Sequence, residues 1–423
     1  MTQSATATSR PARRLVAVVC AAQVLVQIGA FFWPALLPGM MPLWKLTNSE
    51  AGWITASFYG AYMLSVPVLV TLTDRVDPKR VYLFGVGATV LGHLLFALVA
   101  DGFWSALATR ALTGLGWAGT YMTGLKLLAD RIDARMMSRA VTGHAASIGI
   151  SGALSFATGD LIATNFGWRA AFFTAAATAL IAWVMAALIV PAGTVKPKPA
   201  ADGQALYDFR PVFRNRSAMA YALAYCIHTL EMSALRGWGV AFLGWVALST
   251  GSAASAALSP AIIATALGLI GTAASVAGNE MAIRFGRRRL IATAMIASIV
   301  LGGSIGFLGA ASYTVAAGLL MAYGLVIWLD SSSLTAGAAG TAEPSRRGAT
   351  LAVHSTLGYA GGFVGPLLVG WVLDWSGGMS PTGWGLAFLV NAVLMAAALA
   401  VFWHLRPAEL AGDKGEKPTP ANA

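Results

Sequence analysis

The chain has 423 residues, of which 57% are hydrophobic and only 11% are charged, and its formal net charge is +11. A soluble domain is about 45–50% apolar and about 25% charged. The composition therefore excludes an ordinary soluble protein and indicates an integral membrane protein.

Breaks in hydropathy divide the chain into twelve apolar runs, each close to the length of about 20 residues that a membrane-spanning helix needs. These runs are longer than the roughly 10-residue, alternating strands of outer-membrane barrels, and continuous helices satisfy their own backbone groups in lipid. We therefore predict an all-α membrane protein with twelve transmembrane helices. Their cores are expected at residues 15–37, 51–73, 81–100, 103–129, 140–163, 170–190, 218–240, 261–283, 290–310, 313–334, 350–373 and 385–405.

The positive charges lie mainly on one side of these spans. If the amino terminus is cytoplasmic, all but five of the 28 Lys and Arg residues fall in the two tails and the cytoplasmic loops. Because the Lys/Arg bias of short loops sets orientation, both termini are expected in the cytoplasm, with the chain in the cell's inner (plasma) membrane. The charge is then explained by insertion and by attraction to membrane lipids, and nucleic acid is not an expected partner.

The sequence repeats itself after 209 residues. T73-D-R-V-D-P-K-R-V81 aligns with A282-I-R-F-G-R-R-R-L290, and G149-I-S-G152 aligns with G358-Y-A-G361. We expect two six-helix bundles, residues 1–195 and 217–423, joined by a cytoplasmic connector at 196–216, with a short cytoplasmic tail after the last span. Because six is even, both bundles share one orientation, as in a class of secondary transporters that bind substrate between the halves.

Two motifs carry a family resemblance. The loop after the second span resembles the signature G-x-L-x-D-R-x-G-R-K of the major facilitator superfamily (MFS), and R110-A-L-T-G-L-G-W-A-G resembles its Arg-x-x-x-Gly-x-Gly pattern in the fourth span. In the loop, Leu72, Asp74, Arg75 and Lys79 or Arg80 match, whereas Val70 and Asp77 stand where the family usually has glycine. The resemblance implies a monomeric, pseudo-symmetric secondary transporter that works by alternating access.

The resemblance further implies a gating latch. Asp74 is expected to dock on the opposite half, near S345-R-R-G-A-T350, when the cytoplasmic side is closed. The alternative is that Arg75, Lys79 and Arg80 only anchor the loop at the membrane surface. The predicted latch comprises Asp74, Arg75, Lys79, Arg80, Arg346 and Arg347.

Ionisable residues inside the spans are candidates for substrate or proton sites, because each costs about 2.5–3.5 kcal/mol at the centre of a bilayer. Glu231 lies near the middle of the seventh span, and His228 lies one turn before it on the same face. A carboxylate beside a histidine is suited to proton coupling. The alternative is an ion pair that only holds helices together.

Other polar residues within the spans extend this set. Asp330 lies in the tenth span, and Gln23 and Gln27, one turn apart in the first, could donate hydrogen bonds to a substrate. The family pattern makes Arg110 a cavity or coupling residue, although its side chain could instead extend to the outer membrane surface.

The functional prediction follows from the distribution of charge. No nucleotide-binding loop, metal-ligand spacing or catalytic triad is present, so we expect no enzyme activity and no cofactor. A basic group in the first half (Arg110) and acids in the second (Glu231, Asp330) favour proton-coupled uptake of a small anionic or zwitterionic solute, as in a symporter.

Two alternatives remain open. A proton antiporter that exports drugs or metabolites is the first. Proton-antiporting members of the family usually carry Gly-Pro in the fifth span, which G149–D160 lacks. A membrane receptor or scaffold that no longer transports is the more remote second.

Overall fold

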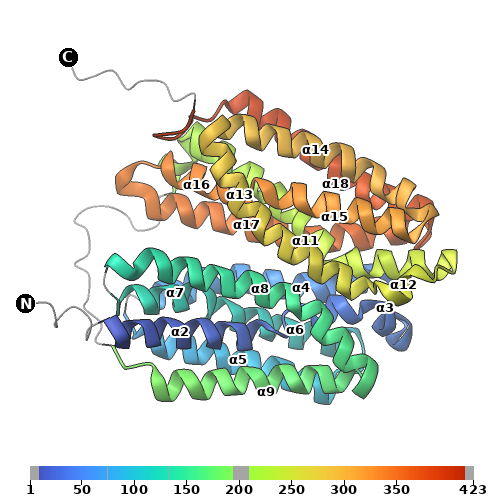
Figure 1. Cartoon of the computed structure of the whole chain (residues 1–423), viewed down its shortest axis with the longest axis horizontal. Helices are drawn as coiled ribbons and strands as arrows, with labels where there is room; N and C mark the ends of the chain where they lie inside the picture. Colours follow the sequence, from blue (N-terminus) through green and yellow to red (C-terminus); the bar gives the residue numbers. More distant parts are fainter. Residues whose placement is uncertain (1–8, 74, 133, 194–208, 415–423) are drawn as a thin grey trace, which may run out of the picture. The chain divides into compact units, whose positions relative to one another are not determined.

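The computed structural model describes residues 9–73, 75–132, 134–193 and 209–414, and over these ranges the chain is helical with no β-strand. Ten spans are long and apolar enough to cross a membrane. The fourth predicted span (α6 with α7) and the seventh (α11) are helical as well. These observations confirm the all-α membrane fold with its twelve predicted spans (Figure 1).

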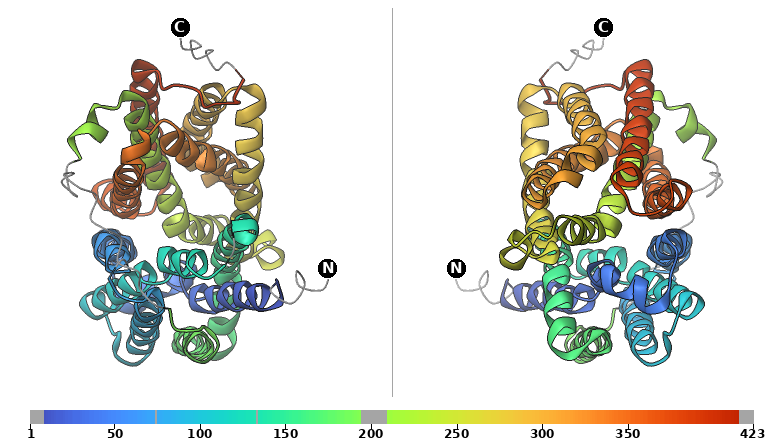
Figure 2. Two further views of the ribbon diagram at one scale, coloured as in Figure 1. Left: turned by 90° about the vertical axis from the view of Figure 1, so that its left-hand side faces the viewer. Right: turned by 90° about the vertical axis from the view of Figure 1, so that its right-hand side faces the viewer.

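The chain divides into two compact units, one formed by residues 1–46 and 53–200 and the other by residues 47–52 and 201–423. Figure 2 shows the helices of each unit gathered into a bundle. The helices of unit 1 are α2 (Ser9–Gln27), α3 (Phe32–Trp44), α4 (Asn48–Leu72), α5 (Pro78–Val99), α6 (Phe103–Ala118), α7 (Tyr121–Ala129), α8 (Ala134–Phe166) and α9 (Trp168–Ile189). The first residues of α4 belong to unit 2.

Unit 2 contains the remaining helices. They are α10 (Arg210–Arg214), α11 (Arg216–Thr250), α12 (Ala254–Ala257), α13 (Pro260–Phe285), α14 (Arg287–Leu308), η1 (Gly309–Ala311), α15 (Tyr313–Leu329), α16 (Ser331–Gly340), η2 (Pro344–Arg346), α17 (Arg347–Trp375) and α18 (Pro381–Leu405). The predicted connector at 196–216 lies mostly outside the described residues.

Three predicted spans are interrupted helices. The first breaks between α2 and α3, the fourth at Gly119 and Thr120, and the tenth at Asp330. In the first span, Pro34 has no N–H with which to bond the carbonyl of Ala30 four residues earlier, so that carbonyl is left for another donor. Broken helices in transporters expose backbone groups where substrates and ions bind. The breaks therefore direct attention to the side chains around them.

Glycines let helices within unit 2 approach closely. A Cβ atom on Gly278 of α13 would overlap the carbonyl of Leu329 in α15, and one on Gly361 of α17 would overlap the carbonyl of Cys226 in α11. Small residues permit such contacts between membrane helices, which associate without a hydrophobic driving force.

The start of α4 is held by two sets of hydrogen bonds. Thr47 N–H donates to Glu50 Oε2 (2.9 Å) and Glu50 N–H donates to Thr47 Oγ1 (3.1 Å), a reciprocal capping box. Asp374, in the last turn of α17, accepts from Asn48 N–H (3.1 Å), Asn48 Nδ2 (2.8 Å) and Ser49 N–H (2.7 Å). A carboxylate is unfavourable at the end of its own helix and favourable at the start of another, so Asp374 stabilises this junction.

In unit 1, Asp77 joins the α4–α5 loop to two other chain segments. It is the N-cap of α5 and accepts from Lys79 N–H (3.0 Å), Arg131 Nη2 (2.6 Å) and Gly193 N–H (2.7 Å). Partial burial raises the pKa of Asp77, but the hydrogen bonds from Gly193, Lys79 and Arg131 and the charge of Arg131 outweigh it, so the pKa lies below its usual value. The ammonium of Lys79 donates to the carbonyls of Ala187 (2.8 Å) and Val190 (2.6 Å).

In unit 2, the tail segment (residues 406–414) folds back onto the helices. The guanidinium of Arg287, at the start of α14, makes two hydrogen bonds to the carboxylate of Asp413 (2.8 and 3.0 Å), and their side chains are only 3% and 2% exposed. Arg287 also donates to Asn279 Oδ1 (3.0 Å) and to the carbonyl of Ser333 (3.2 Å).

A second acid of the tail segment caps α14. The carboxylate of Glu409 accepts from the backbone N–H groups of Arg287 (2.9 Å) and Arg288 (3.2 Å). The tail segment is further held by Tyr221, whose hydroxyl donates to the carbonyl of Ala408 (2.7 Å). The sequence analysis predicted only a short tail here and none of these contacts.

Candidate functional site

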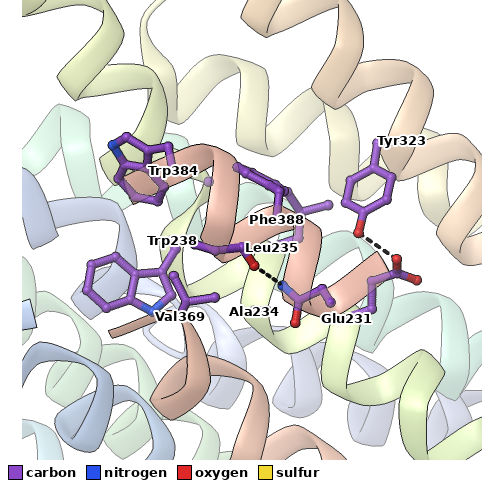
Figure 3. Close-up of a pocket in the computed structure, with 11 residues that line it drawn as sticks. Glu231, Ala234, Leu235, Trp238, Tyr323, Val369, Trp384 and Phe388 are labelled. Carbon is purple, nitrogen blue, oxygen red and sulfur yellow. Dashed lines mark hydrogen bonds between the residues drawn. The ribbon is translucent and has the colours of Figure 1, made fainter. Parts of the chain in front are cut away.

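Glu231 lies inside unit 2 and is 1% exposed. One carboxylate oxygen, Oε1, accepts from Ser298 Oγ of α14 (2.6 Å) and from Tyr323 OH of α15 (2.5 Å). The other oxygen, Oε2, has no hydrogen-bond partner among the described residues. Figure 3 shows the Tyr323 hydroxyl directed at the carboxylate. Glu231 is thus held by two neutral hydroxyl groups and not by a cation.

A pocket with about 290 Å³ of atom-free space adjoins Glu231 and Tyr323. The rings of Trp238, Trp384 and Phe388 form much of its wall, and the two tryptophans lie at the end away from the carboxylate (Figure 3). Asn391 also lines it and has a side-chain oxygen without a partner among the described residues. The pocket therefore combines an aromatic wall with a few polar groups, as small-molecule sites do.

The side chains of His228 and Asp330 lie close together and are buried in the same unit. Nδ1 of His228 lies 3.0 Å from Oδ1 of Asp330, and the side chains are 1% and 5% exposed. Asp330 sits at the break between α15 and α16, which brings its carboxylate to α11. Helical spacing predicted His228 on the same face as Glu231, and it could not predict the contact with Asp330, which comes from another helix.

Arg110 is buried within unit 1 and does not extend to the surface, so the surface alternative is wrong. Arg110 is 2% exposed, and its Nη2 donates to the carbonyl of Ala30 (3.2 Å). Its Cζ atom lies over the ring of Phe58, 4.7 Å from the ring centroid. The accepting carbonyl is the one that Pro34 cannot bond. The Nε and Nη1 groups have no acceptor among the described residues. A buried guanidinium with one backbone partner is an unusual and costly group.

Further polar side chains of unit 1 are also buried. Gln23, Gln27 and His93 are 0–2% exposed, and each has side-chain atoms without a partner in the described part of the chain. Gln27 and His93 line a pocket with about 200 Å³ of atom-free space, together with Val26, Ala30, Phe58, Thr89, Thr113 and Trp117. The sequence analysis missed His93, although a histidine within the third predicted span carries the same burial cost as the residues it did select.

The predicted latch residues lie around the start of α5 in unit 1 and the start of α17 in unit 2. Asp74 lies outside the described residues, so its docking stays a prediction. Arg75, Arg80 and Arg347 are exposed and Arg346 is partly buried. Lys79 caps the end of α9 within its own unit, as described above.

The interrupted helices, the repeat and the buried ionisable residues agree with a comparison of families. The profile of the Major Facilitator Superfamily matches residues 19–264, more than half of the chain. The chain belongs to the major facilitator superfamily. It is a multi-pass membrane protein of a transporter family, and such proteins move small-molecule solutes.

Individual relatives are distant. The chain is 26% identical to protein spinster homolog 1 of Homo sapiens over 238 residues, which cover 54% of this chain and 45% of that protein. It is 28% identical to the uncharacterized MFS-type transporter YbcL of Bacillus subtilis (strain 168) over 205 residues, covering 45% and 51% of the two chains. The chain thus spans about half the length of the curated relatives it matches.

Solved structures extend the similarity of fold to nearly the whole chain. One is a bacterial homologue of the human lysosomal transporter spinster in an inward-facing, occupied conformation, with TM-score 0.77, 15% identity and coverage of 97% and 100%. Another is a mutant form of the nucleoside transporter NupG, with TM-score 0.75, 15% identity and coverage of 92% and 99%. At these identities the likeness supports the fold and not the substrate.

Proposed function

We propose that this chain is a secondary active transporter that takes up a small anionic or zwitterionic solute with protons by alternating access. The observation that carries the proposal is the environment of Glu231. Removing an ionised carboxylate from water is costly unless it is paired with a cation. Glu231 has only the hydroxyls of Ser298 and Tyr323 as partners among the described residues.

This environment suits a group that gains and loses a proton. A hydroxyl can donate a hydrogen bond to a carboxylate or accept one from a carboxylic acid by rotating its O–H bond. Ser298 and Tyr323 can therefore satisfy Glu231 in both protonation states. The free Oε2 atom is the position to which a proton or a donor group of the solute would bind.

The solute class is inferred from the unequal charges of the two units. Unit 1 buries Arg110 with no acid partner among the described residues, whereas unit 2 buries Glu231 and the His228–Asp330 pair. A solute with a negative group can bind the guanidinium, while Glu231 carries the proton. Gln23 and Gln27 offer additional hydrogen bonds. The inward direction is supported by the absence of Gly-Pro in the fifth span. We further propose that the chain lies in the inner membrane with both termini in the cytoplasm.

The test is proton flux in proteoliposomes loaded with a pH-sensitive dye. A solute that is co-transported, drawn from a panel of monocarboxylates and amino acids, will acidify the lumen when it is added outside. We expect Glu231→Gln to lose both this flux and gradient-driven accumulation, while Glu280→Gln, an exposed acid of α13, retains them. Full accumulation by the Glu231→Gln protein would remove Glu231 from the coupling role.

One observation favours export of amphipathic compounds as a second candidate. The pocket beside Glu231 is walled mainly by Trp238, Trp384, Phe388 and aliphatic side chains, which suit an apolar ligand. In the same vesicles, an exporter would release protons in exchange for a cationic dye and would not respond to monocarboxylates.

A further inference from the structure

The pocket of unit 1 concentrates N–H donors that have no acceptor among the described residues. Three of the side chains that line it, Gln27, His93 and Trp117, carry such groups, and Arg110 lies against its walls at Ala30 and Phe58. The unsatisfied atoms are Gln27 Nε2, Trp117 Nε1, Nε and Nη1 of Arg110, and the two ring nitrogens of His93, one of which is a donor in the neutral imidazole. In native proteins buried polar groups are paired in the large majority of cases.

The walls supply little to balance these donors. The hydroxyls of Thr89 and Thr113 donate to the carbonyls of Gly85 (3.1 Å) and Thr109 (3.0 Å) in their own helices. No carboxylate from the described part of the chain lines the pocket, and Arg110 makes no ion pair with any residue in the described ranges. The chemistry that satisfies a guanidinium, an indole N–H, an amide N–H and an imidazole together is an oxyanion.

The placement of these groups is specific. His93 reaches the pocket beside Gly29, where a Cβ atom would lie 2.8 Å from its Nε2 atom. Arg110 is fixed by the carbonyl of Ala30 at the break between α2 and α3. The rings of Phe58 and Trp117 stack with centroids 5.0 Å apart, and both residues line the pocket.

We infer that unit 1 contains a binding site for a carboxylate, in which Arg110, His93 and Trp117 donate to the oxygens and the wall of Phe58 and Trp117 contacts the apolar part of the ligand. The roles of His93 and Trp117 as specificity-determining residues go beyond the proposed function. The role of the site in transport rests on that function, but binding itself does not.

The test is equilibrium dialysis of radiolabelled benzoate against the purified full-length protein in detergent, with unlabelled acetate, benzamide and benzylamine as competitors. Benzoate has the carboxylate and a flat ring, benzamide has the same shape without charge, and benzylamine has the opposite charge. We expect benzoate to bind at a single saturable site, acetate to compete, and benzamide and benzylamine to compete at least tenfold more weakly than benzoate.

Variants locate the site. Arg110→Gln, which keeps a polar side chain but removes the guanidinium, should weaken benzoate binding at least tenfold. Trp117→Phe keeps the ring and removes only the N–H, and His93→Ala removes the imidazole, so each should weaken binding several-fold. Arg169→Gln, an exposed arginine of the same unit, is the matched control and should bind as the wild type does.

Several results would overturn the inference: no saturable benzoate binding, equal competition by benzamide, or unchanged affinity in Arg110→Gln. Unchanged affinity in both Trp117→Phe and His93→Ala would remove these two residues from the site. Proton flux in vesicles is measured separately. If the wild-type protein shows proton flux but no saturable benzoate binding, this inference alone is refuted. If it binds benzoate but shows no proton flux, the proposed coupling alone is refuted.

Discussion

The buried ion pair between Arg287 and Asp413 predicts a large loss of stability when the tail acid is removed. In Asp413→Ala, the guanidinium keeps only Asn279 and the carbonyl of Ser333 as partners among the described residues. Removing one member of a buried pair leaves an uncompensated charge and costs about 3–5 kcal/mol. The exposures of 3% and 2% place this pair in that class.

The control is an ion pair of the same charge type at the surface. Lys126 Nζ lies 3.5 Å from Asp130 Oδ2, and the two side chains are 31% and 43% exposed. Asp130→Ala should therefore lower the free energy of unfolding by only about 0–0.5 kcal/mol. Both variants are unfolded by titration with SDS in mixed micelles, and the free energy of the transition is compared with that of the wild type.

A double variant separates the charge from the contact. Replacing both partners by apolar residues, in Arg287→Met with Asp413→Leu, should recover most of the loss, because no buried charge is then left unpaired. A loss for Asp413→Ala no larger than that for Asp130→Ala would refute the reasoning and would mean that the tail segment separates from α14 in solution.

Three further predictions concern helix contacts and pH. Gly278→Ala should cost about 2 kcal/mol or more, because its methyl group overlaps the Leu329 carbonyl, whereas Gly318→Ala, with no atom within 4 Å of the added carbon, should be neutral or stabilising by about 0.5–1 kcal/mol in the same titration. The pKa of Asp77 is lowered by folding, so its contribution is present above its unfolded pKa near 3.8 and is lost as the pH falls through the lower folded value. Asp77→Asn should therefore destabilise the protein by about 1 kcal/mol at pH 7 and by almost nothing at pH 2, and an equal loss at both pH values would contradict this. Asp374→Ala should cost about 1–2 kcal/mol and speed hydrogen exchange at Asn48 and Ser49, and unchanged exchange there would show that the capping box alone holds the start of α4.

The fold was predictable from the sequence because span length and hydropathy determine it almost alone. Long apolar runs can only be helices in lipid, and the offset of 209 residues indicated a duplicated bundle. The capping box at Thr47 and Glu50 is likewise a local feature, since it depends on residues only three positions apart.

The site was predictable only in part. Burial cost selected Glu231, Asp330 and Arg110, all of which are buried. Their partners come from other helices: Ser298 and Tyr323 are 67 and 92 residues from Glu231. Helical periodicity orders residues along one helix and carries no information on which helix faces it, so the contact between His228 and Asp330 was not predicted.

The start of the third span in each half shows how the two copies have diverged. At the position of Asp77 the second copy has Gly286, and the carboxylate that accepts the first N–H groups of α14 comes instead from Glu409. One duplicated bundle thus carries its capping acid in the loop, while the other borrows an acid from more than 120 residues downstream. The start of α14 therefore depends on a residue of the tail segment, where the start of α5 depends on its own loop.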